Sequence, residues 1–138
     1  MTAKKLYSKP DIMLLATDHD RLTALTQAVM YRQPEIAAIL NEELERAHVV
    51  SDGRHWKHVV RLGSNVEYRD DTTGASRRVS VVLPGEEDIS RGKVSVLTPV
   101  GTALIGLRSG QSIAWRTRNG QVKQLTVLEV DQASEELE

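Results

Sequence analysis

The chain has 138 residues, of which 40% are hydrophobic and 27% charged, and its formal net charge is -1. These values are typical of a globular protein with one moderate domain or two small ones. The balanced charge excludes a polybasic module for nucleic acid or a membrane surface, and it does so along the whole chain. The first fifty residues carry six basic and seven acidic side chains, and the remainder carries twelve of each.

Several further classes of protein are excluded by what the composition lacks. Cysteine is absent, which excludes a disulfide framework, a thiolate nucleophile and a cysteine-ligated metal. Phenylalanine is also absent and the chain has only three tyrosines and two tryptophans, so we expect no aromatic-lined pocket for a small-molecule substrate. No apolar run approaches the roughly 18 residues of a transmembrane helix. The start of the chain, MTAKKLYSKP, lacks the apolar stretch of a signal peptide, so a cytoplasmic protein is expected.

The first third of the chain predicts two helices joined by a turn. An apolar run at residues 12–15 predicts a short strand, and Thr17 with Asp20 has the spacing of a capping box. Pro34 ends the first helix and suits the first turn of the second. The apolar positions at helical spacing are Leu22, Leu25 and Val29 in the first helix, and Ile36, Ile39, Leu40, Leu44 and Ala47 in the second.

These two helices form an antiparallel hairpin in the prediction. Each arm has roughly 14 residues, and at about 1.5 Å per residue it is about 20 Å long. The acidic residues Glu42, Glu43 and Glu45 are expected on its solvated side. The polar residues 51–54 mark a boundary, so we expect a hairpin domain at residues 1–53 and a second domain at residues 54–138.

The second domain has the pattern of a β-sheet with one short helix. Apolar residues alternate with polar ones at Val66 and Tyr68 and again at Val79 and Val81, which is the period of a half-buried strand. Asn119-Gly120, between strands expected at residues 112–118 and 121–130, is the strongest short signal for a hairpin turn. The predicted fold class is therefore α+β, with a helical hairpin followed by an antiparallel sheet.

The short helix falls in the segment 93–110, which reads KVSVLTPVGTALIGLRSG. Thr98 has the residue type of a helix cap, and Pro99 fits the first turn because its missing N–H costs nothing there. Gly106 and Gly110 are stop and turn signals. No residue of the segment is typical of catalysis. The segment predicts a rigid loop and helix end on which a partner could dock.

The same segment resembles a known family. The stretch GKVSVLTPVGTALIG at residues 92–106 is similar to the Gre transcript-cleavage factors of bacterial RNA polymerase, which usually have Ser-Pro at the position of Thr98-Pro99. The resemblance covers residues 58–130. Beyond the quoted stretch it includes Ile113 and the last strand of this range. In the first third, the residues that resemble the Rnk branch, the so-called regulators of nucleoside diphosphate kinase, are Asp18, Arg21, Leu22, Pro34 and the run LNEELERAHVV at 40–50.

The resemblance implies an FKBP-like second domain that binds polymerase at the mouth of its secondary channel. The expected contact is the coiled-coil rim of the largest subunit, with nucleic acid met only through polymerase. The residues that the family position assigns to this contact are Thr98, Pro99, Val100 and Gly101. A purely structural role for these four residues stays open beside it, since Thr98 and Pro99 also suit a helix start.

Transcript cleavage is not expected of this chain. A cleavage factor places acidic residues at the tip of a long coiled coil, because a second Mg²⁺ needs oxygen ligands to activate water. Here the predicted tip contains Arg32, Gln33 and Glu35, with Glu35 as its only carboxylate. We therefore expect binding to polymerase without cleavage and in competition with Gre factors.

No catalytic residue, metal or cofactor is predicted. His55 and His58 are three residues apart, but other ligands for a metal are not evident. Two other functions remain as alternatives: direct regulation of nucleoside diphosphate kinase, and peptidyl-prolyl isomerisation, which the FKBP-like fold suggests but the few aromatic residues oppose. The sequence contains no phosphate-binding glycine motif.

Overall fold

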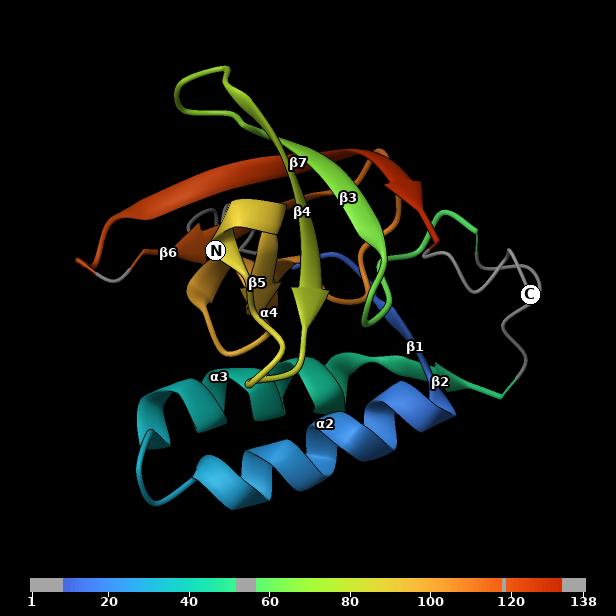
Figure 1. Cartoon of the computed structure of the whole chain (residues 1–138), viewed down its shortest axis with the longest axis vertical. Helices are drawn as coiled ribbons and strands as arrows, with labels where there is room; N and C mark the ends of the chain where they lie inside the picture. Colours follow the sequence, from blue (N-terminus) through green and yellow to red (C-terminus); the bar gives the residue numbers. More distant parts are fainter. Residues whose placement is uncertain (1–8, 52–56, 118, 133–138) are drawn as a thin grey trace, which may run out of the picture.

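The computed structural model of the chain describes residues 9–51, 57–117 and 119–132. It confirms the α+β class, with a helical hairpin followed by a sheet that carries one short helix (Figure 1). In chain order the elements are β1 (Met13–Leu15), α2 (Ala16–Val29), α3 (Pro34–Arg46), β2 (His48–Val50), β3 (Asn65–Asp70), β4 (Ser76–Val82), the 3-10 helix η1 (Ile89–Arg91), β5 (Lys93–Ser95), α4 (Pro99–Leu104), β6 (Ser112–Arg116) and β7 (Val122–Asp131).

Helices α2 and α3 lie side by side below the sheet (Figure 1). They have 14 and 13 residues, which confirms arms of about 20 Å. The predicted capping box was wrong, because α2 begins at Ala16 after Leu15 and has no side-chain cap. Asp18, in its first turn, is buried and accepts a hydrogen bond from the backbone N–H of Leu62 at 3.2 Å. This hydrogen bond ties the start of α2 to the sheet domain.

One acidic residue of α3 is buried, contrary to prediction. Glu42 and Glu45 are exposed as expected, but Glu43 is only 1% exposed. Its carboxylate accepts hydrogen bonds from Arg46 at 2.6 Å and from Lys9 at 3.3 Å, and Arg46 also donates to the carbonyl oxygen of Pro10. A buried carboxylate needs such charged partners. The cluster fastens the segment before β1 to α3.

The main sheet has five strands in the order β5-β4-β3-β7-β6. All neighbours are antiparallel except β4 and β5, which are parallel. A second, two-stranded sheet pairs β1 with β2 in parallel, with Met13 opposite His48. Strand β2 was not predicted, since α3 was expected to include Ala47. The hairpin turn at Asn119-Gly120 is confirmed, because Thr117 and Gln121 pair on either side of it.

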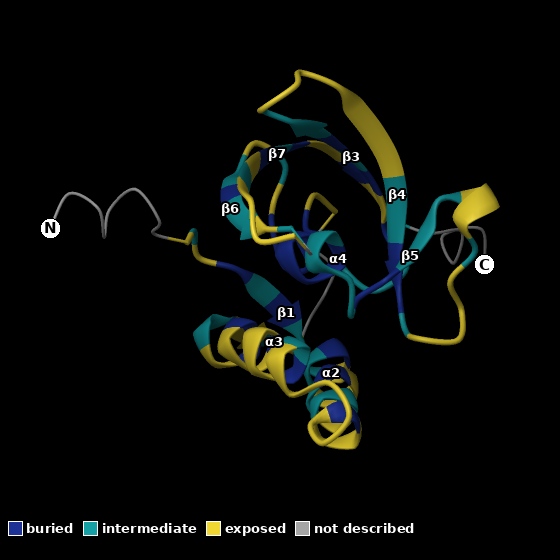
Figure 2. Cartoon of the chain, turned by 90° about the vertical axis from the view of Figure 1, so that its left-hand side faces the viewer, coloured by how far each residue is buried: buried dark blue, intermediate teal, exposed yellow. Residues whose placement is uncertain are grey.

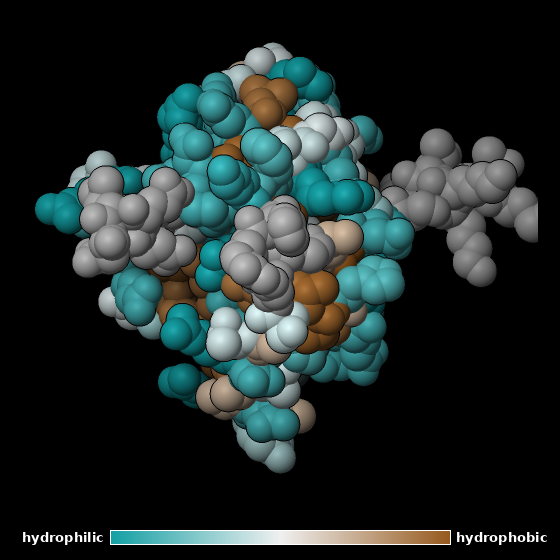
Figure 3. All heavy atoms as spheres, turned by 90° about the vertical axis from the view of Figure 1, so that its right-hand side faces the viewer, coloured by the Kyte–Doolittle hydropathy of each residue, from teal (hydrophilic) through white to brown (hydrophobic). Residues whose placement is uncertain are grey.

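The sheet curls around α4, and the helical hairpin closes one end of the curl (Figure 2). One hydrophobic core therefore includes residues from both predicted domains. Its larger members are Ile12, Leu14, Leu22, Leu40 and Leu44 from the first third, and Leu104, Ile105, Leu107, Ile113, Leu125 and Val127 from the rest. The boundary predicted between residues 53 and 54 lies outside the described residues and stays a prediction. The face opposite that of Figure 2 is mostly hydrophilic, with apolar side chains at its centre (Figure 3).

The turn after β3 carries a carboxylate whose ionisation stabilises the sheet. Burial raises the pKa of Asp71, but hydrogen bonds from Thr126 at 2.6 Å and Arg69 at 2.7 Å outweigh it and hold this pKa below its usual value. A lowered folded-state pKa means that the charged carboxylate stabilises the fold above its unfolded pKa of about 3.9 and that this contribution is lost in more acidic solution.

We therefore expect Asp71→Asn to lower the free energy of unfolding at pH 7 and to have less effect as the pH falls below about 4. Urea unfolding of both proteins between pH 7 and pH 3 measures the difference. A difference that does not shrink in acid would contradict this account of Asp71.

Candidate functional site

The start of α4 is built by local hydrogen bonds. The hydroxyl of Thr98 accepts a hydrogen bond from the N–H of Gly101 at 3.1 Å and donates one to the carbonyl oxygen of Ser95 at 2.7 Å. Pro99 occupies the first turn, as predicted. The hydroxyl of Thr102, one turn on, donates to the carbonyl oxygen of Val96 at 2.6 Å. The start of α4 is thus held in place by the hydroxyl groups of Thr98 and Thr102.

The four residues assigned to docking differ in what they offer a partner. Gly101 is buried, and a Cβ atom there would meet the carbonyl oxygen of Ser95 and lie 2.9 Å from the Thr98 hydroxyl. The side chain of Thr98 is engaged within the chain. Pro99 and Val100 are half-buried and present apolar atoms to solvent. Contact with a partner would therefore fall on Pro99 and Val100, while Thr98 and Gly101 hold them in place.

A shallow apolar groove runs beside this helix end. We call it the α4 groove. Its lining combines aliphatic and aromatic side chains with a few polar ones, as expected for a surface that takes an apolar side chain. It is lined by Val94, Thr98, Pro99, Val100, Trp115, Thr117 and Asn119.

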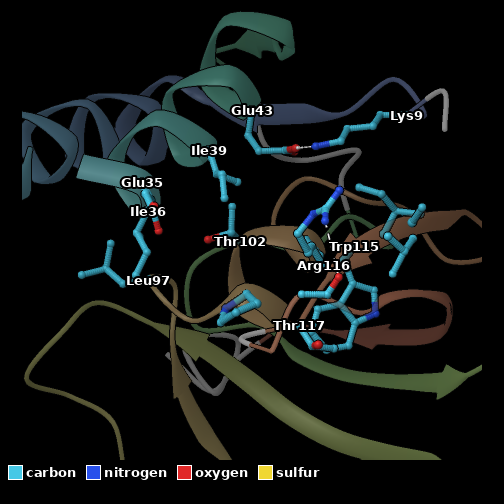
Figure 4. A pocket seen from close by; sticks show the side chains of 16 residues that line it. Lys9, Glu35, Ile36, Ile39, Glu43, Leu97, Thr102, Trp115, Arg116 and Thr117 are labelled. Atoms are coloured by element: carbon cyan, nitrogen blue, oxygen red, sulfur yellow. Dashed lines mark hydrogen bonds and ion pairs between the residues drawn. The ribbon is translucent and has the colours of Figure 1, made fainter. Parts of the chain in front are cut away.

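A second groove, of about 620 Å³, lies between α3 on one side and α4 with β6 on the other. We call it the α3–β6 groove. Figure 4 shows Ile36 and Ile39 on the α3 side, Leu97 and Thr102 across from them, and Trp115 and Arg116 at the far end. The two grooves share Pro99, Trp115 and Thr117, so they form one continuous surface.

Trp115 lies where the two grooves meet. It was expected in the core or over the sheet, and it is half-buried against the core. Its indole Nε1 is shielded from solvent and has no hydrogen-bond partner among the described residues. The ring therefore contributes apolar area to the lining of both grooves.

The hairpin tip is exposed. Arg32, Gln33 and Glu35 are all solvent-accessible, and Tyr31 beside them is 90% exposed. Glu35 lies in the first turn of α3 and also lines the α3–β6 groove. The structure thus places Glu35 and Pro99, from the two predicted sets of site residues, along one groove, while Arg32 and Gln33 do not line it.

Within the described ranges, no group of three or more histidine and acidic side chains is arranged to hold a metal ion. His58 is described, whereas His55 lies outside the described residues. None of the described helices is both long and apolar enough to cross a bilayer.

Three residues of this surface were not predicted to belong to a site. Ile36 and Ile39 were assigned to the apolar face of α3, yet Ile39 is 45% exposed and both line the α3–β6 groove. Leu40 and Leu44 supply a buried stripe for this short helix, and the two isoleucines lie beside it, where residue spacing alone does not tell whether another element covers them. Trp115 was considered only as a packing residue.

Comparison with known families agrees with this fold. The sequence profile described as "Transcription elongation factor, GreA/GreB, C-term" matches residues 55–132, which is more than half of the chain. The chain belongs to this family of transcription elongation factors. Its first part is of the Rnk type, since the profile described as "Rnk N-terminus" matches residues 10–50.

Individual relatives support both assignments. A protein named "Regulator of nucleoside diphosphate kinase" from Escherichia coli (strain K12) is 36% identical over 124 residues, which are 90% of this chain and 91% of that protein. "Transcription elongation factor GreA" from Roseiflexus castenholzii is 34% identical over 87 residues, 63% of this chain and 55% of that factor. The chain thus aligns with about half the length of that GreA.

A solved structure shows the same fold. The "Prokaryotic transcription elongation factor GreA/GreB from Nitrosomonas europaea" superimposes with a TM-score of 0.68 at 33% identity, covering 89% of this chain and 99% of that one. The names of these relatives describe regulators and transcription factors rather than a catalysed reaction. The predicted resemblance to the Gre family and its Rnk branch is confirmed.

Proposed function

We propose that this chain is a transcription regulator that docks on bacterial RNA polymerase through the start of α4 and does not promote transcript cleavage. Membership of the GreA/GreB family supports polymerase as the partner. The rim coiled coil of the largest subunit, near the secondary channel, is the docking element we propose. In this role the chain acts in the cytoplasm and competes with Gre factors for the same contact.

The hairpin is the observation that carries the proposal of binding without cleavage. Its arms of 14 and 13 residues reach only about 20 Å. The exposed tip has one carboxylate, Glu35, three residues from the cation of Arg32. A catalytic Mg²⁺ requires several oxygen ligands in a fixed geometry. A short hairpin with a single carboxylate does not supply them.

Val100→Asp tests the docking surface. We expect the substitution to weaken binding to purified core RNA polymerase by at least about tenfold, because it places a charge in an apolar contact. Fluorescence anisotropy with the labelled full chain measures the Kd, and thermal unfolding reports on the fold. Val49→Asp, on the exposed strand β2, is the matched control and should bind normally.

Backtracked elongation complexes test the absence of cleavage. Transcripts should keep their length when the chain is added, and the chain should reduce cleavage by an added Gre factor. Shortened transcripts in the absence of any Gre factor would contradict the proposal. So would tight binding to a purified nucleoside diphosphate kinase with no binding to polymerase.

A further inference from the structure

The two grooves and helix α3 form one surface that extends the proposed docking site. We infer that the polymerase contact does not end at α4 but continues past Trp115 into the α3–β6 groove, where Ile36 and Ile39 contact the same partner. The inference rests on the proposed function, because it names more of the same interface. It gives the hairpin a role in docking that does not require its tip to enter a channel.

Continuity of the surface is the first argument. A partner seated on Pro99 and Val100 lies over the α4 groove, and the residues that separate this groove from its neighbour are common to both. Trp115 is the aromatic residue that lines both grooves. A tryptophan at the centre of a contact, surrounded by smaller apolar groups, is the usual arrangement of an energetically dominant residue.

The exposed aliphatic side chains are the second argument. Ile39 projects from α3 toward Thr102 of α4, and Ile36 lies near Leu97 (Figure 4). Ile39 is 45% exposed and Val122, on the opposite wall, is 48% exposed. Exposed aliphatic side chains that line a groove gain free energy when a partner covers them.

The charges along the groove describe the partner. Glu35 is exposed at the end near Leu97, and Arg116 is exposed at the end near Trp115 (Figure 4). Glu43 lies between them and is paired with two cations, Lys9 and Arg46, so this cluster carries a net positive charge. The surface therefore fits a helical segment of polymerase with aliphatic side chains on one face, a basic residue opposite Glu35 and an acidic residue opposite Arg116.

The decisive variant is Ile39→Asp in the full chain. Its side chain is partly exposed, and the hydrogen bonds that build the start of α4 are made by residues 95–102, so the fold and the α4 groove should be retained. We expect the Kd for core RNA polymerase to rise by at least about tenfold, with the melting temperature unchanged. Val49→Asp is the control, since it places the same charge on a similarly exposed aliphatic position of β2.

Two substitutions of Trp115 separate ring area from the N–H group. Trp115→Ala should weaken binding by at least about tenfold, whereas Trp115→Phe should stay within about threefold of the wild type, because the indole N–H has no hydrogen-bond acceptor in the described part of the chain. Equal loss in both variants would contradict a role through apolar area. If Trp115→Ala alters the fold, its loss of binding is not informative, and the Kd of Ile39→Asp tests the inference instead.

The outcomes separate this inference from the proposed function. If the wild type binds and Val100→Asp does not, but Ile39→Asp binds normally, the interface ends at α4 and the inference is wrong while the proposed function stands. If the wild type does not bind polymerase, the proposed function itself fails. Loss of binding in Val100→Asp and Ile39→Asp, with Val49→Asp unaffected, supports the extended surface.

Discussion

Gly101→Ala is expected to lower the free energy of unfolding by about 3 kcal/mol, because the backbone around this residue leaves no room for a methyl group. The new Cβ would meet the carbonyl oxygen of Ser95 and would lie 3.0 Å from the Cα of Val96. Both atoms belong to the backbone of the segment that carries the cap of α4, so neither can move without disturbing the helix start. Urea unfolding at pH 7 measures the loss.

Gly110→Ala is the matched control for this prediction. Gly110 has φ +91, and a methyl group added there would have nothing within 4 Å other than its chain neighbours. Alanine at this position therefore adds backbone strain of about 1–2 kcal/mol without a clash. A smaller loss in Gly101→Ala than in Gly110→Ala would contradict the steric account. Polymerase binding of Gly101→Ala should fall together with its stability, which distinguishes this position from Val100.

Arg46→Met is expected to destabilise the chain by about 3 kcal/mol, since among the described residues it leaves the buried carboxylate of Glu43 with the partly exposed Lys9 as its one charged partner. It also removes the hydrogen bond to the carbonyl oxygen of Pro10. Chemical unfolding of the variant at pH 7 measures this effect. The methionine keeps most of the aliphatic stem of arginine, so the loss reports mainly on charge and hydrogen bonding.

The double variant Glu43→Leu with Arg46→Met tests the cause. Replacing both members of a buried ion pair with apolar residues is often close to neutral, so the double variant should be more stable than Arg46→Met alone. An additive loss would show that Arg46 acts through something other than the Glu43 carboxylate. The stability of Glu43→Leu alone is the remaining measurement that this double-mutant cycle requires.

Local signals in the sequence were sufficient for the elements that local contacts decide. Thr98, Pro99 and Gly101 lie within four residues, and the start of α4 is fixed by the hydrogen bond from Gly101 to Thr98 and by Pro99 in the first turn. Asn119 and Gly120 likewise predict their turn without reference to the rest of the chain. For these segments, residue type and spacing carry the physical cause of the structure.

Contacts between distant segments could not be predicted in the same way. Strand β2 forms because residues 48–50 meet β1, which lies 35 residues earlier in the chain. Glu43 is buried because Lys9 and the segment before β1 cover it, whereas its acidic neighbours in the sequence suggested a solvated face. Arg46, three residues later, was the available hint of an ion pair. The parallel pairing of β4 with β5 depends on the path of an intervening loop.

Ile39 illustrates the same limit at the candidate site. Helical spacing placed it on the apolar face of α3, but spacing does not say how wide a stripe the sheet domain covers. The groove exists because α4 and β6 approach only part of that face. Its residues become evident as a surface only when both walls are positioned.

In the hairpin, the residues that attach it to the rest of the chain are different from the residues at the end that determine its length. The contacts that tie it to other segments, Asp18 with Leu62 and Glu43 with Lys9, lie away from the exposed residues 30–35. Two additional helical turns in each arm, inserted near that end, would lengthen the hairpin by about 10 Å without touching these contacts. The chain is therefore a ready scaffold for building probes of graded length, in which acidic residues at the new end could be added separately from length.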